Sequence, residues 1–381
     1  MSSGYRYAPL RERRLLVVLA GAACVGVRAA TALERANVPH LAALAARGSC
    51  ARLRAVAPHL PAQPSAAYAA LLGVVPPQAP DQAAVVAAAS GAALAAGERC
   101  MLVEVCDHAG RPAPALHVAR AAEVLRARLS RQRVMMLPGG HQILLAGPHR
   151  PELPQVDGLE LRGAPVGWLP ASPPLDERTV VIAVVGSPLL GVAQLLGARC
   201  IAVDASISGA GAPAVVRLRS LATRELRAEP ATVVVEAAGP LLARRSQRDE
   251  DAREAAVAAV LSGLDRGLLG PLYAVASWCG TAFAVTADLP RAGDGTPCQG
   301  EVPLIVAGWR GGAPARMPRR PVGVSVSLPP VYSERGLHDR TIVTTPFAVP
   351  PAQDPNAPQR FARDVQTGSI VGPLNNSRRG E

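Results

Sequence analysis

The side chains that could carry chemistry are few and lie far apart in the sequence. Asp204 and Asp288 each come shortly after an apolar segment that predicts a strand. Carboxylates at strand ends are candidate metal ligands or bases, with turn or helix-cap roles as the alternative. Gly186-Ser187-Pro188 could bind a phosphate at a helix start, although an ordinary strand-to-helix turn is the preferred interpretation. The histidines show no metal-binding spacing: His40, His59, His108, His117, His141, His149 and His338.

The elements that position these residues are short apolar runs separated by helical stretches. The predicted strands are Leu15–Leu19, Met101–Val105, Ile143–Leu145, Val180–Val185, Ala198–Val203, Thr232–Val235, Ala282–Thr286 and Leu304–Val306. The predicted helices are Pro39–Arg47, Ala66–Leu72, Val118–Arg131, Gly191–Leu196 and Asp249–Leu268. We expect Gly270-Pro271 to end the last helix. This alternation predicts an α/β fold with a mostly parallel sheet.

Composition favours a folded chain with a mainly solvated basic surface. The 381 residues are 49% hydrophobic, which excludes wholesale disorder, and only 3% aromatic. All 40 basic residues are arginine, giving a net charge of +11. The arginines are scattered and lack interleaved aromatics, so a specific nucleic-acid interface is not expected. The bias towards arginine, alanine, glycine and proline is typical of a GC-rich coding sequence.

The cysteines and the N-terminal apolar run bear on location. Seven cysteines without a CxxC pair indicate reduced thiols, and hence a cytoplasmic protein. The apolar run Leu15–Val27 follows the basic segment Arg11–Arg14 and includes Cys24, so an exported lipoprotein is one alternative. A buried first strand, Leu15–Leu19, is preferred. No apolar run reaches the roughly 18–20 residues that span a membrane.

Several segments, taken together and in order, resemble a known enzyme family. They are Asn37–Gly48, Ser65–Gly73, Ala183–Cys200, Val235–Gly239 and Phe283–Asp288. This pattern is similar to that of the archaeal-type cofactor-independent (2,3-bisphosphoglycerate-independent) phosphoglycerate mutases, isomerases of the alkaline phosphatase superfamily. The resemblance implies a three-layer alkaline phosphatase-like core with an inserted smaller α/β domain. With the proline-rich segments, it places the core at 1–79 and 166–345, the insertion at 80–165 and a disordered tail at 346–381.

The family transfers a phosphoryl group through a phosphoserine, using two divalent metals. Most of the required residues are absent here. The resemblance places the lost positions at Ala20, Pro64, Tyr68, Gly239, Ala243 and Leu289. Asp288 remains as a vestigial metal ligand, and Ser65 lies one residue from the position of the nucleophile. No histidine lies between His149 and His338, so shifting the alignment cannot supply the missing ligands.

These losses predict a phosphoglycerate mutase-like pseudoenzyme that needs no cofactor. It would serve as a scaffold, as a regulator with a protein partner, or as a binder of an anionic small molecule. The alternative is an active phosphate-ester transferase or mutase with Ser65 as nucleophile and Asp288 as base or single-metal ligand. In that case Mn, Mg or Zn would be used, or arginines would replace the charge of the metals.

Overall fold

The structure is a computed structural model with side chains. It describes residues 13–24, 31–92, 98–137, 142–171, 174–175, 177–204, 212–228 and 231–307, and the backbone of three short strands beyond them. Those strands are β12 (Val331–Tyr332), β13 (His338–Asp339) and β14 (Thr345–Pro346). The predicted tail from residue 347 onward lies outside the described residues, as does His141.

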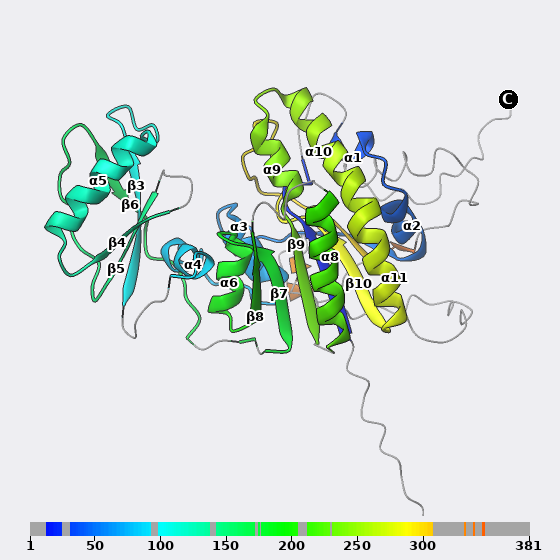
Figure 1. Ribbon diagram of the computed structural model, residues 1–381. Helices are drawn as coiled ribbons and strands as arrows, with labels where there is room; N and C mark the ends of the chain where they lie inside the picture. Colours follow the sequence, from blue (N-terminus) through cyan, green and yellow to red (C-terminus); the bar gives the residue numbers. More distant parts are fainter. Residues whose placement is uncertain are drawn as a thin grey trace, which may run out of the picture.

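The core is an eight-stranded sheet in the order β14-β2-β11-β10-β1-β9-β7-β8 (Figure 1). Its main strands are β1 (Arg13–Leu19), β2 (Ser49–Leu53), β7 (Thr179–Val184), β8 (Arg199–Val203), β9 (Thr232–Ala237), β10 (Thr281–Thr286) and β11 (Val302–Ala307). Strands β10, β1, β9, β7 and β8 run parallel, whereas β11 is antiparallel to both β10 and β2. The predicted α/β class with a mostly parallel sheet is therefore confirmed.

The continuous apolar run of β1 follows from burial on both faces of the sheet. Leu15, Val17 and Leu19 contact one core cluster, and Leu16 and Val18 contact the other. A strand in the middle of a parallel sheet needs apolar side chains at every position because helices cover both faces. The preferred interpretation of Leu15–Leu19 as a buried strand is confirmed.

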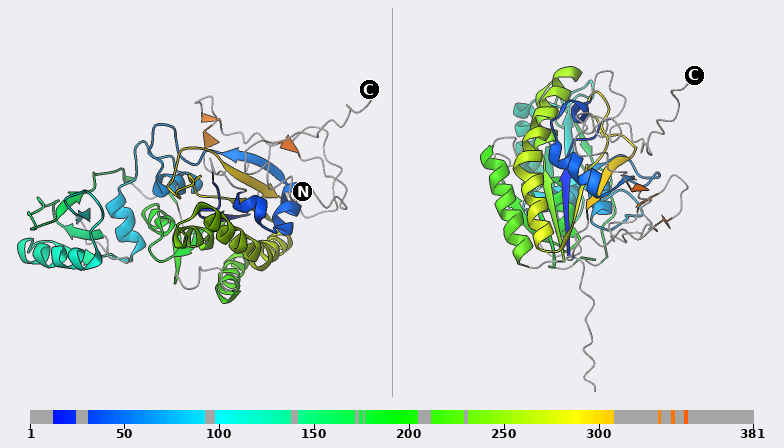
Figure 2. Two further views of the ribbon diagram at one scale, coloured as in Figure 1. Left: turned by 90° about the horizontal axis from the view of Figure 1, so that it is seen from above. Right: turned by 90° about the vertical axis from the view of Figure 1, so that its right-hand side faces the viewer.

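Helices form the two outer layers, as the right-hand view of Figure 2 shows for one face. That face is covered by α1 (Ala32–Arg35), α2 (Pro39–Arg47), α8 (Ala212–Arg227), α10 (Glu250–Leu264) and α11 (Gly270–Trp278), with α9 (Gly239–Ser246) packed on α10. The other face is covered by α3 (Pro64–Leu71) and α6 (Pro188–Leu195). The result is the three-layer arrangement expected for an alkaline phosphatase-like core.

The expected end of a helix at Gly270-Pro271 is wrong. Helix α10 continues through a π-helical turn, η1 (Asp265–Leu269), directly into α11. Pro271 has no N–H for the carbonyl of Gly267, and Arg219 Nη1 donates to that carbonyl instead at 3.5 Å. A π turn absorbs the misfit without ending the helix. The combined helix is long and apolar enough to span a membrane by length and composition, but its apolar stripe packs in the core.

Helix α10 also fixes the chain that follows β1. Glu254 Oε2 accepts a hydrogen bond from the backbone N–H of Ala32 at 2.7 Å, and so caps α1. Asp265 accepts from the N–H groups of His40 and Leu41 at 2.9 and 2.7 Å, and caps α2, whose own N-cap residue offers no side-chain acceptor. Burial raises the pKa of Asp265.

A second sheet has the order β4-β5-β3-β6 and lies beside the core in Figures 1 and 2. Its elements are β3 (Arg99–Cys106), α5 (Ala115–Arg128), β4 (Arg133–Met136), β5 (Gln142–Gly147) and β6 (Glu160–Gly163). Helix α5 covers one face, and α4 (Gln82–Ala89) covers the other. The domain boundaries at 80 and 165 stay a prediction.

Helix α4 joins this smaller unit to the core by packing on α6. An added Cβ at Gly191 would lie 2.0 Å from the carbonyl oxygen of Val85, so only glycine allows this approach. The N–H of Gly186 donates to the carbonyl of Ala89 at 3.0 Å. The chain crosses between the units at Pro80 and Trp168, which form a parallel bridge.

Candidate functional site

The carboxyl end of β1 is where the resemblance places the active site. Ala20 is fully buried there, and its N–H donates to the carbonyl of Ala237 at 3.2 Å. Gly21 follows with a φ of 75°, and an added Cβ would lie 2.7 Å from Cα of Leu241. Its N–H donates to Asp288 Oδ1 at 2.7 Å. The ends of β1, β9 and β10 therefore converge, as they must in a site built at strand ends.

Asp288, the surviving acidic position, is engaged by protein donors at both oxygens. Oδ1 accepts from Gly21, and Oδ2 accepts from Arg291 Nη2 at 2.8 Å. Both side chains of this ion pair are almost completely buried. A guanidinium group thus supplies the positive charge beside Asp288.

Tyr68, where the resemblance places a family histidine, is also buried and paired. Its hydroxyl donates to Glu236 Oε1 at 2.9 Å, linking α3 to β9. Ser187 also hydrogen-bonds to Glu236, and its Oγ accepts from the N–H of Leu189 at 3.1 Å, capping α6. Burial raises the pKa of both Tyr68 and Glu236. Ser187 therefore acts as a helix cap next to a carboxyl group, which disfavours a phosphate at this turn.

Ser65 is buried in the first turn of α3 and faces an amide. Its Oγ accepts from Gln82 Nε2 at 2.5 Å. The same NH₂ group donates to Gln63 Oε1 at 3.1 Å and to the carbonyl oxygen of Pro80 at 3.2 Å. Because a carbonyl oxygen can only accept a hydrogen bond, the NH₂ end of the Gln82 amide must face it. Within the described part of the chain, no carboxylate or imidazole hydrogen-bonds to the Ser65 hydroxyl. A general base for this hydroxyl is thus lacking among those residues.

The remaining family positions offer no ligands. Leu289 packs in an apolar cluster with Ala66 and Ala67. Gly239 is buried at the start of α9, and Ala243 is half-buried in the same helix, while Pro64 begins α3. Asp204 is exposed beyond the edge strand β8, which β9 and β7 separate from β1, so it does not join the site.

This donor set does not fit a two-metal centre. Such a centre needs about four to six ligands per metal ion. Among the described residues, no group of three or more His, Cys, Asp or Glu side chains is placed to hold a metal ion. Asp288 already has both oxygens hydrogen-bonded, and we derive no reaction step through a metal.

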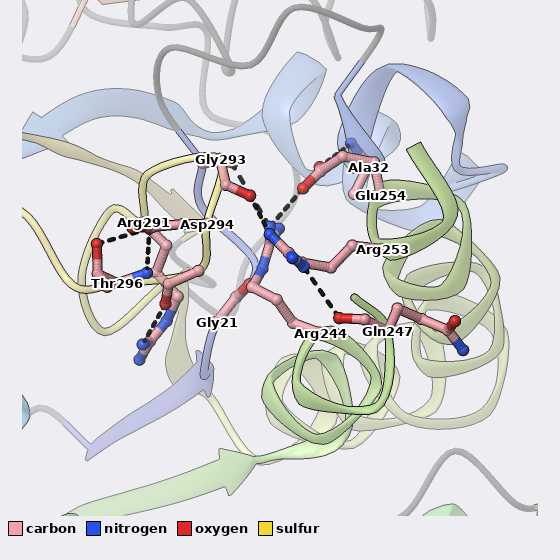
Figure 3. A network of polar contacts seen from close by, with 12 residues as sticks. Gly21, Ala32, Arg244, Gln247, Arg253, Glu254, Arg291, Gly293, Asp294 and Thr296 are labelled. Atoms are coloured by element: carbon pink, nitrogen blue, oxygen red, sulfur yellow. Dashed lines mark hydrogen bonds and ion pairs between the residues drawn. The ribbon is translucent and has the colours of Figure 1, made fainter. Parts of the chain in front are cut away.

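Two further arginines complete a polar network around Gly21 (Figure 3). Arg244 Nε donates to the carbonyl of Gly21 at 3.1 Å, and its Nη1 pairs with Glu254. Arg253 donates to the carbonyls of Gln247, Arg248 and Gly293. Burial and the neighbouring Glu254 raise the pKa of the Cys24 thiol to about 11, so this thiol stays protonated at neutral pH.

Sequence reasoning missed these partners of the site. The only sequence feature that pointed to Arg291 was its position three residues after Asp288. Glu254 was a buried charge inside an otherwise apolar helical stripe, a pattern that predicts a buried partner. Arg244 and Gln82 carried no signal, because their contacts join segments far apart in the chain.

No family model and no curated protein matches the sequence. Among solved structures, the PH0037 protein from Pyrococcus horikoshii superposes with a TM-score of 0.60 at 17% identity, covering 78% of this chain and 88% of its own. A cofactor-independent phosphoglycerate mutase from Thermoplasma acidophilum gives a TM-score of 0.47 at 18% identity, covering 79% and 91%. The chain therefore shares its overall fold with the Pyrococcus protein.

Proposed function

We propose that this chain is a phosphoglycerate mutase-like pseudoenzyme, which has lost two-metal phosphotransfer and works as a binding or regulatory protein. The observation that carries the proposal is the pairing of Asp288 with Arg291 and the N–H of Gly21. A cation would have to displace a buried guanidinium to reach this carboxylate, which would then leave an unpaired buried arginine. The proposal rests on the resemblance for the family and on this pairing for the loss.

The surroundings of Ser65 support the same conclusion. A serine hydroxyl needs an adjacent base or a metal to become a nucleophile, and an amide NH₂ group cannot accept its proton. Gln82 holds this hydroxyl as an acceptor within a buried junction of α3 and α4. Ser65 thereby has the contacts of a structural residue.

The central position of β1 in the sheet supports the proposal that the N-terminal segment is not cleaved off. Cleavage before Cys24 would remove Leu15–Leu19, the strand paired with both β9 and β10. The large sheet would then lose its middle. We therefore propose that the apolar run is not a cleaved signal segment, and that the chain stays in the cytoplasm.

Metal content and turnover of the purified full chain test the pseudoenzyme proposal. We expect less than one divalent ion per chain after incubation with Mn, Mg or Zn, because the ligands are missing. We also expect the wild-type chain to interconvert 3- and 2-phosphoglycerate no faster than the Ser65→Ala variant does. Two bound ions per chain, or an interconversion that Ser65→Ala abolishes, would contradict the proposal and favour the active-enzyme alternative.

A further inference from the structure

Two buried arginines beside Gly21 have N–H groups without an acceptor. Arg244 is 2% exposed and Arg291 is 3% exposed. Among the described residues, Arg244 Nη2 and Arg291 Nε have no hydrogen-bond partner and almost no contact with solvent. Native structures rarely leave such donors unsatisfied, and each case calls for an explanation, such as a bound molecule.

The two guanidinium groups lie at one place in the fold. Arg244 donates to the carbonyl of Gly21, and Arg291 holds the carboxylate that accepts from the N–H of the same glycine. Both also meet Gly295: Arg291 Nη1 donates to its carbonyl at 3.5 Å, and an added Cβ there would lie 3.9 Å from Cδ of Arg244. The unpartnered N–H groups therefore belong to one cluster at the carboxyl end of β1.

Arg253 is a useful contrast within the cluster, since backbone carbonyls accept from all three of its nitrogens. Arg244 and Arg291 instead each keep one buried N–H group without an acceptor among the described residues. Buried cationic donors without an acceptor favour a bound anion.

We propose that Arg244 and Arg291 form a receptor for a small tetrahedral oxyanion at the carboxyl end of β1. Phosphate and sulfate carry several acceptor oxygens, and the planar fork of arginine matches them. Glu254 pairs with Arg244 Nη1 and Asp288 with Arg291 Nη2, so the anion accepts from the remaining donors, Arg244 Nη2 and Arg291 Nε. The idea rests on the proposed function, because here arginines supply the charge that metals supply in the family.

Calorimetric titration with inorganic phosphate and with sulfate tests this receptor. The full chain is treated with a chelator before the titration. We expect saturable binding of both anions in preference to chloride at equal ionic strength. Arg244→Lys and Arg291→Lys keep the positive charge but remove the free N–H groups, so each should weaken binding at least about tenfold. The control, Arg162→Lys, changes a surface arginine of the smaller unit and should leave the affinity unchanged.

The outcomes separate this inference from the proposed function. No selective binding by the wild-type chain overturns the inference even if the two lysine variants fail to fold. Equal affinity in folded lysine variants also overturns it, as does binding that the chelator abolishes. A metal-free, inactive chain that ignores phosphate leaves the pseudoenzyme proposal standing, whereas two bound metal ions overturn that proposal.

Discussion

Replacing Gly191 by alanine should loosen the junction between the smaller unit and the core. The added Cβ would lie 2.0 Å from the carbonyl oxygen of Val85, 2.9 Å from its carbonyl carbon and 3.1 Å from Cβ of Ala89. An ordinary contact needs about 3.4 Å, so α4 and α6 must move apart by roughly 1.4 Å at this point. That shift also strains the hydrogen bond from Gly186 to Ala89.

The cost follows from overpacking and from this hydrogen bond. Overpacking in a well-packed core costs about 1–3 kcal/mol, and a weakened hydrogen bond adds about 1 kcal/mol. Alanine recovers up to about 1 kcal/mol through its higher helix propensity. We therefore expect Gly191→Ala to destabilise the chain by about 1–3 kcal/mol, and to lower the melting temperature by roughly 1–4 °C.

Gly263→Ala is the matched control, because Gly263 is exposed within α10 and an added Cβ there meets nothing within 4 Å. It should stabilise the chain by about 0.5–1 kcal/mol. Thermal melts followed by circular dichroism give the overall stability. The fluorescence of Trp168, which lies at the crossing between the units, reports the junction. If Gly191→Ala is as stable as Gly263→Ala, the close packing of α4 on α6 is refuted.

Three other substitutions test the buried polar groups. Glu254→Gln leaves Arg244 without its charged partner and should lower the free energy of unfolding in urea by about 3–5 kcal/mol. Glu160→Gln, at an exposed ion pair, is the control and should leave the urea midpoint unchanged. Equal effects of the two substitutions would contradict the burial of the pair between Arg244 and Glu254. Tyr68→Phe removes a donor to Glu236 and should cost about 1–3 kcal/mol, so an unchanged midpoint would contradict the hydrogen bond. Burial raises the pKa of Glu236 above 4.5, so its contribution is fully present below pH 4.5 and is lost as the pH rises through the folded-state pKa. The stability of wild type relative to Glu236→Gln should therefore fall as the pH rises above the usual pKa of a glutamate in thermal melts, and a constant difference would contradict this assignment.

The fold could be predicted where the sequence pattern is local. Apolar runs such as Leu15–Leu19 and Ala282–Thr286 predicted central strands, since burial on both faces permits little else. The short strands β2, β4 and β6 were missed because their exposed positions carry arginine or glutamate, which interrupts the apolar pattern. Helix α4 was missed because its apolar residues face both α6 and the smaller sheet, leaving no amphipathic period.

The contacts of the site could not be predicted from the sequence. Ala20, Tyr68 and Leu289 are positions where the resemblance places lost ligands, and this loss stays a prediction. The contacts around these positions join segments that lie far apart in the chain. The hydrogen bond from Gly21 to Asp288 spans 267 residues, and such pairings arise from the tertiary fold and not from local spacing.

The place of β1 at the centre of the sheet has a consequence for synthesis of the chain. Both of its hydrogen-bonded neighbours, β9 and β10, are made more than two hundred residues later. At about 5–20 residues per second, the apolar strand waits roughly 10–50 s for its partners. During that time it is a candidate for aggregation, and Arg13 and Arg14 at its start are the kind of charged residues that protect such segments. Newly made chains should therefore depend on holding chaperones more than the finished protein does.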